Sequence, residues 1–188
     1  MLDAHRKNVE VIVKVLVSEV EIQTAVSRVA REITEREAGR PLTVIAIMTG
    51  SIVFLADLIR KLEMPLRVGV IQTSSYRDGE KRGRLVVNSD MMPDIAGRDV
   101  LLVDDIFDTG NTLFEVLTML DEFQPDTVRS AVLMHKVGRQ EVAMKPDYVG
   151  FEIPDKFVVG YGLDYNDLYR NLPYIGVLEP HDLAEHSP

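Results

Sequence analysis

The segment spanning residues 100–113 constrains the fold of this chain more than any other part of the sequence. It reads VLLVDDIFDTGNTL. An apolar run typical of a buried strand stops at two adjacent carboxylates, and a third carboxylate, a short polar loop and the apolar spacing of a helix follow. In open α/β sheets, ligands bind at the carboxyl ends of parallel strands. The segment therefore predicts a ligand site between a strand and a helix.

The residue types in this loop indicate a phosphorylated sugar as the ligand. Backbone N–H groups at a helix N-terminus suit a phosphate, and Gly110 permits a tight turn. Thr109 and Thr112 add hydroxyl donors. The carboxylates of Asp104 and Asp105 suit sugar hydroxyls or a hard divalent cation. The alternative is an ordinary strand–helix turn in which an aspartate caps the helix.

Strands and helices alternate from residue 42 to residue 135, which predicts a parallel sheet with helices on both faces. Before it, Ser18 and Glu21 form a capping box for a helix that ends at Gly39. Residues 77–84 break the periodicity, so we expect a mobile hairpin there. The expected strands cover 42–48, 66–75, 85–88, the apolar run before the acidic loop, and 127–135; the expected helices cover 52–62 and the stretch up to 123.

Length and composition predict one globular domain. The chain has 188 residues, 46% of them hydrophobic and 27% charged, enough for a substantial core. It has no cysteine, which excludes disulfides and thiolate chemistry. The net charge of −9 argues against a nucleic-acid partner. The start of the sequence lacks an apolar signal region and no run is long enough to span a membrane, so we expect a cytoplasmic protein.

Four separated segments carry a resemblance to a known family. The acidic loop resembles the phosphoribosyl-pyrophosphate motif of type I phosphoribosyltransferases. Residues 145–166 are similar to the purine-binding hood of the hypoxanthine-guanine branch, residues 74–76 to its lid, and residues 133–136 to the strand with its base-recognising lysine. The resemblance covers roughly residues 10–180. It implies the type I phosphoribosyltransferase fold, an α/β fold with a mostly parallel twisted sheet flanked by helices, with a core at about 40–140 and a small hood formed by the N-terminal segment and about 145–180.

The resemblance also implies a reaction. Members of this branch transfer the 5-phosphoribosyl group from phosphoribosyl pyrophosphate to N9 of hypoxanthine or guanine. The products are IMP or GMP and pyrophosphate, and Mg²⁺ assists. Members commonly assemble, so a homodimer or homotetramer is expected.

On the sugar side, Asp108 matches the family's catalytic base, which takes the proton from N7 of the purine. The alternative is that it only caps the helix. Asp104, where the family usually has Glu, and Asp105 would bind the ribose hydroxyls directly or through the metal. Asp164 would be a further metal-side carboxylate in the hood. The 5′-phosphate would be held by Thr109, Gly110, Asn111 and Thr112.

On the purine side, Lys136 would donate to O6 of the base, Phe157 would stack on it, and the backbone of Val158 would bond its edge, with Asp164 nearby. The alternatives are a solvated lysine and a core phenylalanine. Pyrophosphate would be bound by Thr49, Gly50 and Arg170, and Ser75 and Tyr76 would form the lid.

Position 49 departs from the family pattern, because Thr49 stands where a lysine usually precedes the glycine. This removes a positive charge beside the leaving group. Pyrophosphate binding should then depend more on backbone N–H groups. The sequence leaves open whether the peptide bond before Thr49 is cis.

Two other functions remain open. The first is a regulatory binding protein on this scaffold that senses the nucleotide and controls RNA, although the net charge argues against a basic RNA-binding face. The second is a sibling enzyme for xanthine or adenine. Lys136 argues against adenine, which offers a donor at position 6, but does not separate xanthine from guanine.

Overall fold

A computed structural model describes residues 14–78 and 81–179, without the side chains of 74–85. Its main sheet has six strands in the order β4-β3-β2-β5-β6-β7. All neighbouring pairs are parallel except β3 and β4, which form an antiparallel hairpin. This confirms the predicted fold class. The strands are β2 (Leu42–Met48), β3 (Leu66–Asp78), β4 (Lys81–Asn88), β5 (Asp99–Phe107), β6 (Thr127–Lys136) and β7 (Tyr148–Ile153).

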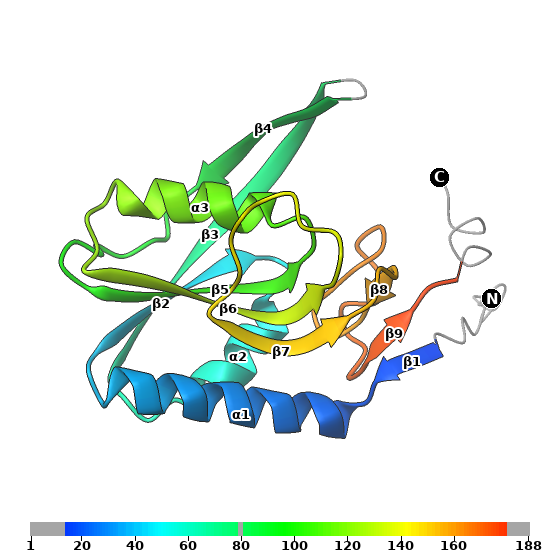
Figure 1. The fold of residues 1–188 in the computed structure, drawn as a ribbon, viewed down its shortest axis with the longest axis horizontal. Coiled ribbons are helices and arrows are strands. Elements are labelled where there is room, and N and C mark those ends of the chain that lie inside the picture. Colours follow the sequence, from blue (N-terminus) through cyan, green and yellow to red (C-terminus); the bar gives the residue numbers. More distant parts are fainter. Residues whose placement is uncertain (1–13, 79–80, 180–188) are drawn as a thin grey trace, which may run out of the picture.

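Helices cover both faces of this sheet (Figure 1). Helices α1 (Glu19–Glu37) and α2 (Ile52–Ile59) lie on one face, and α3 (Asn111–Asp121) lies on the other. Alternate side chains of the strands point to opposite faces. Two buried apolar clusters result, one beneath α1 and α2 and one beneath α3.

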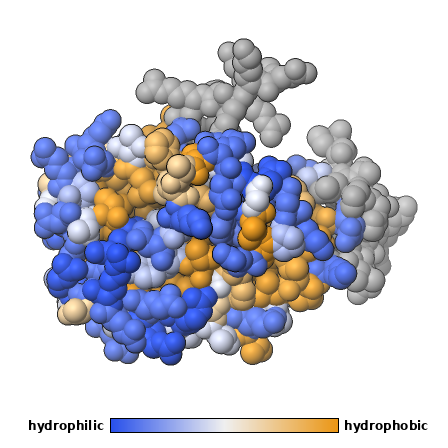
Figure 2. All heavy atoms as spheres, in the orientation of Figure 1, coloured by the Kyte–Doolittle hydropathy of each residue, from blue (hydrophilic) through white to orange (hydrophobic). Residues whose placement is uncertain are grey.

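A second, small sheet joins the two ends of the described chain. Its order is β1-β9-β8, with β1 (Lys14–Val17) and β8 (Val158–Val159) both antiparallel to β9 (Ile175–Val177). Figure 2 shows a largely hydrophilic face on which hydrophobic residues gather in the region of this sheet. Residues 148–153 of the predicted hood (about 145–180) form β7 of the main sheet. From here on, we call residues 154–177 together with β1 the hood; its limits as a subregion stay a prediction.

Local signals placed both ends of α1 well but overestimated the lengths of α2 and α3. Ser18 and Glu21 form the predicted capping box of α1. The helix ends at Ala38 and Gly39, which both take positive φ angles. Helix α2 is three residues shorter than predicted, because its last turn tightens with the N–H of Lys61 donating to the carbonyl of Leu58. Helix α3 likewise ends two residues early.

The charged segment 77–84 was predicted as a mobile hairpin, with the expected strands ending at residue 75 and beginning again at residue 85. The hairpin is confirmed, but β3 and β4 extend into the segment and pair as far as Asp78 and Lys81. Backbone pairing requires no apolar periodicity, which explains the missed strand residues. In Figure 1 this hairpin projects from the body of the molecule.

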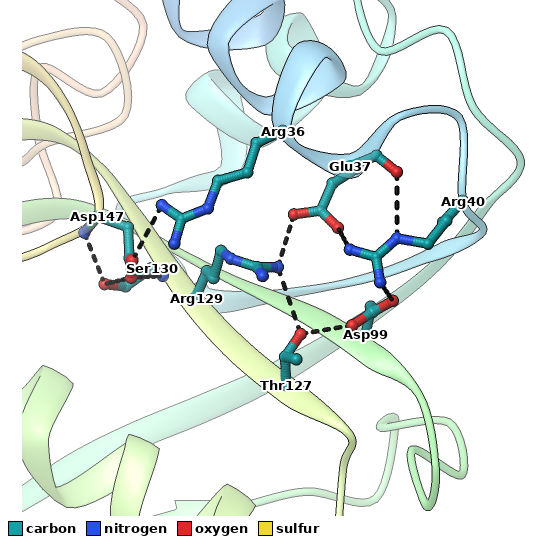
Figure 3. Close-up of polar contacts among 8 residues, drawn as sticks. All are labelled: Arg36, Glu37, Arg40, Asp99, Thr127, Arg129, Ser130 and Asp147. Atoms are coloured by element: carbon teal, nitrogen blue, oxygen red, sulfur yellow. Dashed lines mark hydrogen bonds and ion pairs between the residues drawn. The ribbon is translucent and has the colours of Figure 1, made fainter.

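An ion network closes the amino-terminal edge of the main sheet (Figure 3). The carboxylate of Glu37, 2% exposed, accepts from Arg129 at 2.7 Å and from Arg40 at 3.2 Å. Arg40 also pairs with Asp99 at 3.3 Å, and Thr127 donates to Asp99. A buried charge needs such partners. These contacts therefore hold the end of α1 against β5 and β6.

Within the described residues, no helix is long and apolar enough to cross a membrane.

Candidate active site

The acidic loop lies at the opposite, carboxyl-terminal edge of the sheet. Strand β5 ends at Phe107, and α3 begins after Gly110, which has a φ of 85°. A Cβ on Gly110 would lie 2.5 Å from both Phe107 and Val142. Glycine is therefore required here, both for the backbone angle and for space. This confirms the predicted tight turn between strand and helix.

The loop forms one wall of a cavity of about 280 Å³. The predicted residues that line this cavity, called here the sugar-phosphate cavity, are Gly50, Asp104, Asp105, Asp108, Thr109, Gly110 and Thr112. Thr73 of β3 also lines it. None of the described lining residues is Lys or Arg. An anion bound here would thus rely on amide and hydroxyl donors and on a cation brought with it.

Asp104 and Asp105 are adjacent carboxylates of this cavity; Asp104 is buried and Asp105 is half-buried. The N–H of Asp105 donates to Oδ1 of Asp104 at 3.0 Å. Burial, followed by repulsion from Asp105, raises the pKa of Asp104 well above its ordinary value. Burial also raises the pKa of Asp105, although hydrogen bonds and the charge of Arg170 oppose the shift. Two adjacent carboxylates that are costly to ionise alone suit a hard divalent cation.

The described residues contain no group of three or more His, Cys, Asp or Glu placed to hold a metal ion. Mg²⁺ usually keeps several waters and binds through one or two carboxylates and the oxygens of its substrate. Asp104 and Asp105 fit that pattern.

The loop between β2 and α2 borders the same cavity. The Met48–Thr49 peptide bond is cis, which answers the question that the sequence left open. A Cβ on Gly50 would lie 1.6 Å from Oδ2 of Asp105, so this glycine is what lets the carboxylate reach the loop. From the other side Gly162 packs on Gly50, since its Cβ would lie 2.1 Å from the Gly50 carbonyl oxygen. The hood and the loop are thus in direct contact.

A second cavity of about 220 Å³ adjoins the first. It is called here the hood cavity, and it is lined by Asp105, Ile106, Asp108, Lys136, Phe157, Val158, Leu163 and Asp164. Three of these residues, Asp105, Ile106 and Asp108, line both cavities. The ring of Phe157 is 43% exposed and meets Tyr165 edge to face at 5.4 Å. It is therefore not a core phenylalanine, and its ring is available to a planar ligand.

Four charged side chains form a closed ring at the hood cavity. Asp108 accepts from Lys136 at 3.3 Å through Oδ2 and from Arg139 at 3.0 Å through Oδ1. Asp155 pairs with the same two cations, at 3.7 Å to Lys136 and 3.2 Å to Arg139. Lys136 is only 9% exposed, so it is not a solvated lysine.

Several predicted residues lie beside the cavities without lining the sugar-phosphate cavity. The amide of Asn111 donates to Glu141 at 2.6 Å and to Thr109 at 3.1 Å, which turns it toward the loop after β6. Thr49 is exposed. Arg170 pairs with Asp164 at 2.9 Å and donates to the carbonyl of Gly162 at 2.8 Å. The side chains of Ser75 and Tyr76 lie outside the described residues.

Sequence reasoning missed Arg139, Asp155, Thr73 and Gly162. The first two lie in short irregular segments, where periodicity carries no signal. Arg139 lies three positions after Lys136 and Asp155 two positions before Phe157. Their closeness to predicted residues was the only available signal.

Comparisons with known proteins agree with this geometry. The model of the phosphoribosyl transferase domain matches residues 17–166. A hypoxanthine phosphoribosyltransferase of Salmonella typhimurium is 41% identical over 167 residues, covering 87% of this chain and 94% of the relative. A hypoxanthine-guanine phosphoribosyltransferase of Staphylococcus epidermidis is 41% identical over 166 residues, covering 88% and 93% of the two chains.

Solved structures give the same result. A crystal structure of a hypoxanthine-guanine phosphoribosyltransferase from Bacillus anthracis superposes with a TM-score of 0.85 at 37% identity, covering 89% of this chain and 99% of that one. A hypoxanthine phosphoribosyltransferase structure from Staphylococcus aureus gives a TM-score of 0.86 at 36% identity, covering 93% and 94% of the two chains.

Proposed function

This chain belongs to the phosphoribosyl transferase family, and from that premise we propose that it transfers the 5-phosphoribosyl group of phosphoribosyl pyrophosphate to N9 of hypoxanthine or guanine. The products are IMP or GMP and pyrophosphate, the chemistry of purine salvage. The relatives named for this activity match over most of their length.

The observation that carries the choice of base is the pairing of Lys136 with Asp108. Their charged ends lie 3.3 Å apart on the wall of the hood cavity. A 6-oxopurine protonated at N7 offers an acceptor, O6, next to a donor, N7–H. A fixed ammonium beside a fixed carboxylate complements that edge. Adenine offers an amino donor at position 6, which would meet another donor.

The residues then have distinct tasks. Asp108 accepts the N7 proton while the bond forms at N9, since it lies between the hood cavity and the sugar-phosphate cavity. Phe157 stacks on the base and the backbone of Val158 bonds its edge. Holding base and sugar in line provides much of the acceleration.

The sugar-phosphate cavity would hold the ribose 5-phosphate. Thr109, Gly110 and Thr112 line it at the N-terminus of α3, where free N–H groups favour a phosphate. Asn111 would assist in holding the 5′-phosphate from the rim. Gly50 would contact pyrophosphate through its backbone, while Thr49 and Arg170 would assist from the rim. Ser75 and Tyr76 are proposed to close over the site and exclude water.

Asp104 and Asp105 would hold Mg²⁺, with Asp164 as a further carboxylate on the metal side. When bound, the cation neutralises the leaving group and orients the sugar. The cost of ionising these two adjacent carboxylates, which raises the pKa of both, supports this assignment.

A product assay tests the proposal. Phosphoribosyl pyrophosphate and Mg²⁺ are offered with hypoxanthine, guanine, xanthine or adenine in turn, and nucleotide formation is followed chromatographically. We expect IMP and GMP and no AMP. XMP as the main product would favour a xanthine enzyme, and no product with any base, together with RNA binding, would favour a regulator.

Assembly and location are the broader parts of the proposal. The family resemblance supports a homodimer or homotetramer, which sedimentation measures directly. A cytoplasmic location stays a prediction from the sequence.

A further inference from the structure

Arg139 holds one oxygen of Asp108 and leaves the other facing Lys136. Its Nε lies 3.0 Å from Oδ1, whereas Nζ of Lys136 lies 3.3 Å from Oδ2. A carboxylate on a strand-end loop can rotate about its side-chain bonds unless it is bonded at both oxygens. The two contacts therefore fix the plane of the carboxylate as well as its position.

The guanidinium of Arg139 is itself held by the hood. Its Nη1 lies 3.2 Å from Oδ2 of Asp155. Asp155 precedes Phe157 by two residues, so the segment that bears the exposed ring is connected through Arg139 to the proposed base. An arginine suits this task because its rigid planar fork directs Nε and Nη1 toward the two carboxylates at a fixed angle. The ammonium of Lys136 also pairs with both carboxylates, but a rotating ammonium does not fix their orientation.

Charge balance gives Asp155 a second task. When Asp108 accepts a proton it loses its negative charge, and two cations, Lys136 and Arg139, remain beside it. Asp155 already pairs with both, at 3.7 Å and 3.2 Å. The two cations thus keep a counter-charge in the state in which Asp108 is neutral.

From this geometry, and resting on the proposed function, we infer that Arg139 and Asp155 are positioning residues for the reaction. Arg139 assigns Oδ2 of Asp108 as the proton-accepting oxygen by occupying Oδ1. Asp155 holds Arg139 and sets the hood segment that carries Phe157 over the base.

The two residues should have different kinetic signatures. Arg139→Gln frees the carboxylate of Asp108, so kcat should fall by roughly tenfold to a hundredfold, the range expected for a misplaced reacting group. Asp155→Asn loosens the hood, so KM for hypoxanthine should rise by about two- to fivefold, as loss of a partly exposed charge pair worth up to about 1 kcal/mol predicts. KM for phosphoribosyl pyrophosphate should change little in either variant.

The experiment measures steady-state kinetics of IMP formation for wild type, Arg139→Gln, Arg139→Lys and Asp155→Asn. Arg31→Gln is the matched control, because Arg31 forms an exposed pair with Glu35 on α1 and lines neither cavity. Arg139→Lys keeps the charge but lacks the fork, so it should restore less than half of the lost kcat on a logarithmic scale. Thermal unfolding of each variant separates a folding defect from a kinetic one.

The outcomes are distinguishable from failure of the proposed function. If wild type forms no IMP, the proposed function is wrong. If wild type forms IMP while Arg139→Gln keeps its kcat, or Arg139→Lys restores it fully, the positioning role of Arg139 is wrong. If Asp155→Asn leaves the hypoxanthine KM at the level of the Arg31→Gln control, the connection to the hood is wrong.

Discussion

Nζ of Lys136 lies 3.3 Å from Oδ2 of Asp108, although 28 residues separate them. The parallel pairing of β5 with β6 brings them together: Phe107 is opposite His135 in the register, so the residue after each lies at the same edge of the sheet. An ammonium donor and a carboxylate acceptor thus stand side by side where two strands end. Substituting either residue of this pair should therefore affect the reaction in a different way.

Replacing Asp108 with asparagine should remove the base and little else. Asparagine keeps the shape but cannot accept the N7 proton, so kcat should fall by about 10²- to 10⁴-fold. KM for phosphoribosyl pyrophosphate should stay close to that of wild type. Asp121→Asn, at the exposed end of α3, is the control for loss of a carboxylate. Wild-type turnover in Asp108→Asn would mean that another group takes the proton.

Lys136→Met should relax discrimination at position 6 of the purine. Methionine fills a similar volume without a charge, so the preference for hypoxanthine over adenine, as a ratio of kcat/KM values, should fall by at least about tenfold. The variant also leaves Asp108 and Asp155 with Arg139 alone, so its thermal stability is measured in parallel. Lys145→Met replaces an exposed lysine for comparison. Unchanged selectivity would assign base recognition to other residues of the hood cavity.

The parts predicted well from sequence are those in which local chemistry repeats along the chain. Strand β2 matches its predicted bounds, and the capping box at Ser18 began α1 at the predicted residue. The acidic loop could be predicted from the sequence because its residues are contiguous and line the same cavity. The ring around Asp108 was not, because Arg139 and Asp155 belong to irregular segments that only the fold brings together. Close packing of Gly162 on Gly50 is equally non-local.

The adjacent carboxylates of Asp104 and Asp105 should make the protein without metal less stable as pH rises. A carboxyl group whose pKa is raised on folding costs no stability while it is protonated in both the folded and the unfolded state. Once the unfolded state ionises, folding has to keep the group protonated or ionise it in an unfavourable place, which lowers the free energy of unfolding. The penalty begins as pH passes the ordinary value of 3.8 and grows until the raised pKa is passed. Neutral pH lies well above the ordinary value, so the penalty is present there.

Asp104→Asn keeps the acceptor for the N–H of Asp105 without the charge. In EDTA its melting temperature at pH 7 should therefore exceed that of wild type, and the difference should shrink as pH approaches 4. The stabilisation that wild type gains from Mg²⁺ with phosphoribosyl pyrophosphate should be reduced in the variant. Calorimetry from pH 4 to pH 8 measures both effects, with Asp121→Asn as reference. If Asp104→Asn were less stable than wild type at pH 7 in EDTA, the ionised carboxylate of Asp104 would not destabilise the fold, and the prediction would be wrong.

Thr49→Lys should strengthen pyrophosphate binding. The described residues that line the sugar-phosphate cavity include three carboxylates and no cationic side chain, and exposed Thr49 stands beside Gly50 at its border. A lysine there would supply charge to an anion otherwise held by amides and metal. A hydrogen bond to a charged group contributes about 1.5–3 kcal/mol. KM for pyrophosphate in the reverse reaction with IMP should therefore fall roughly tenfold or more. Thr49→Gln adds length without charge and should leave it unchanged. An equal fall in both variants would show that reach, and not charge, limits binding at this loop.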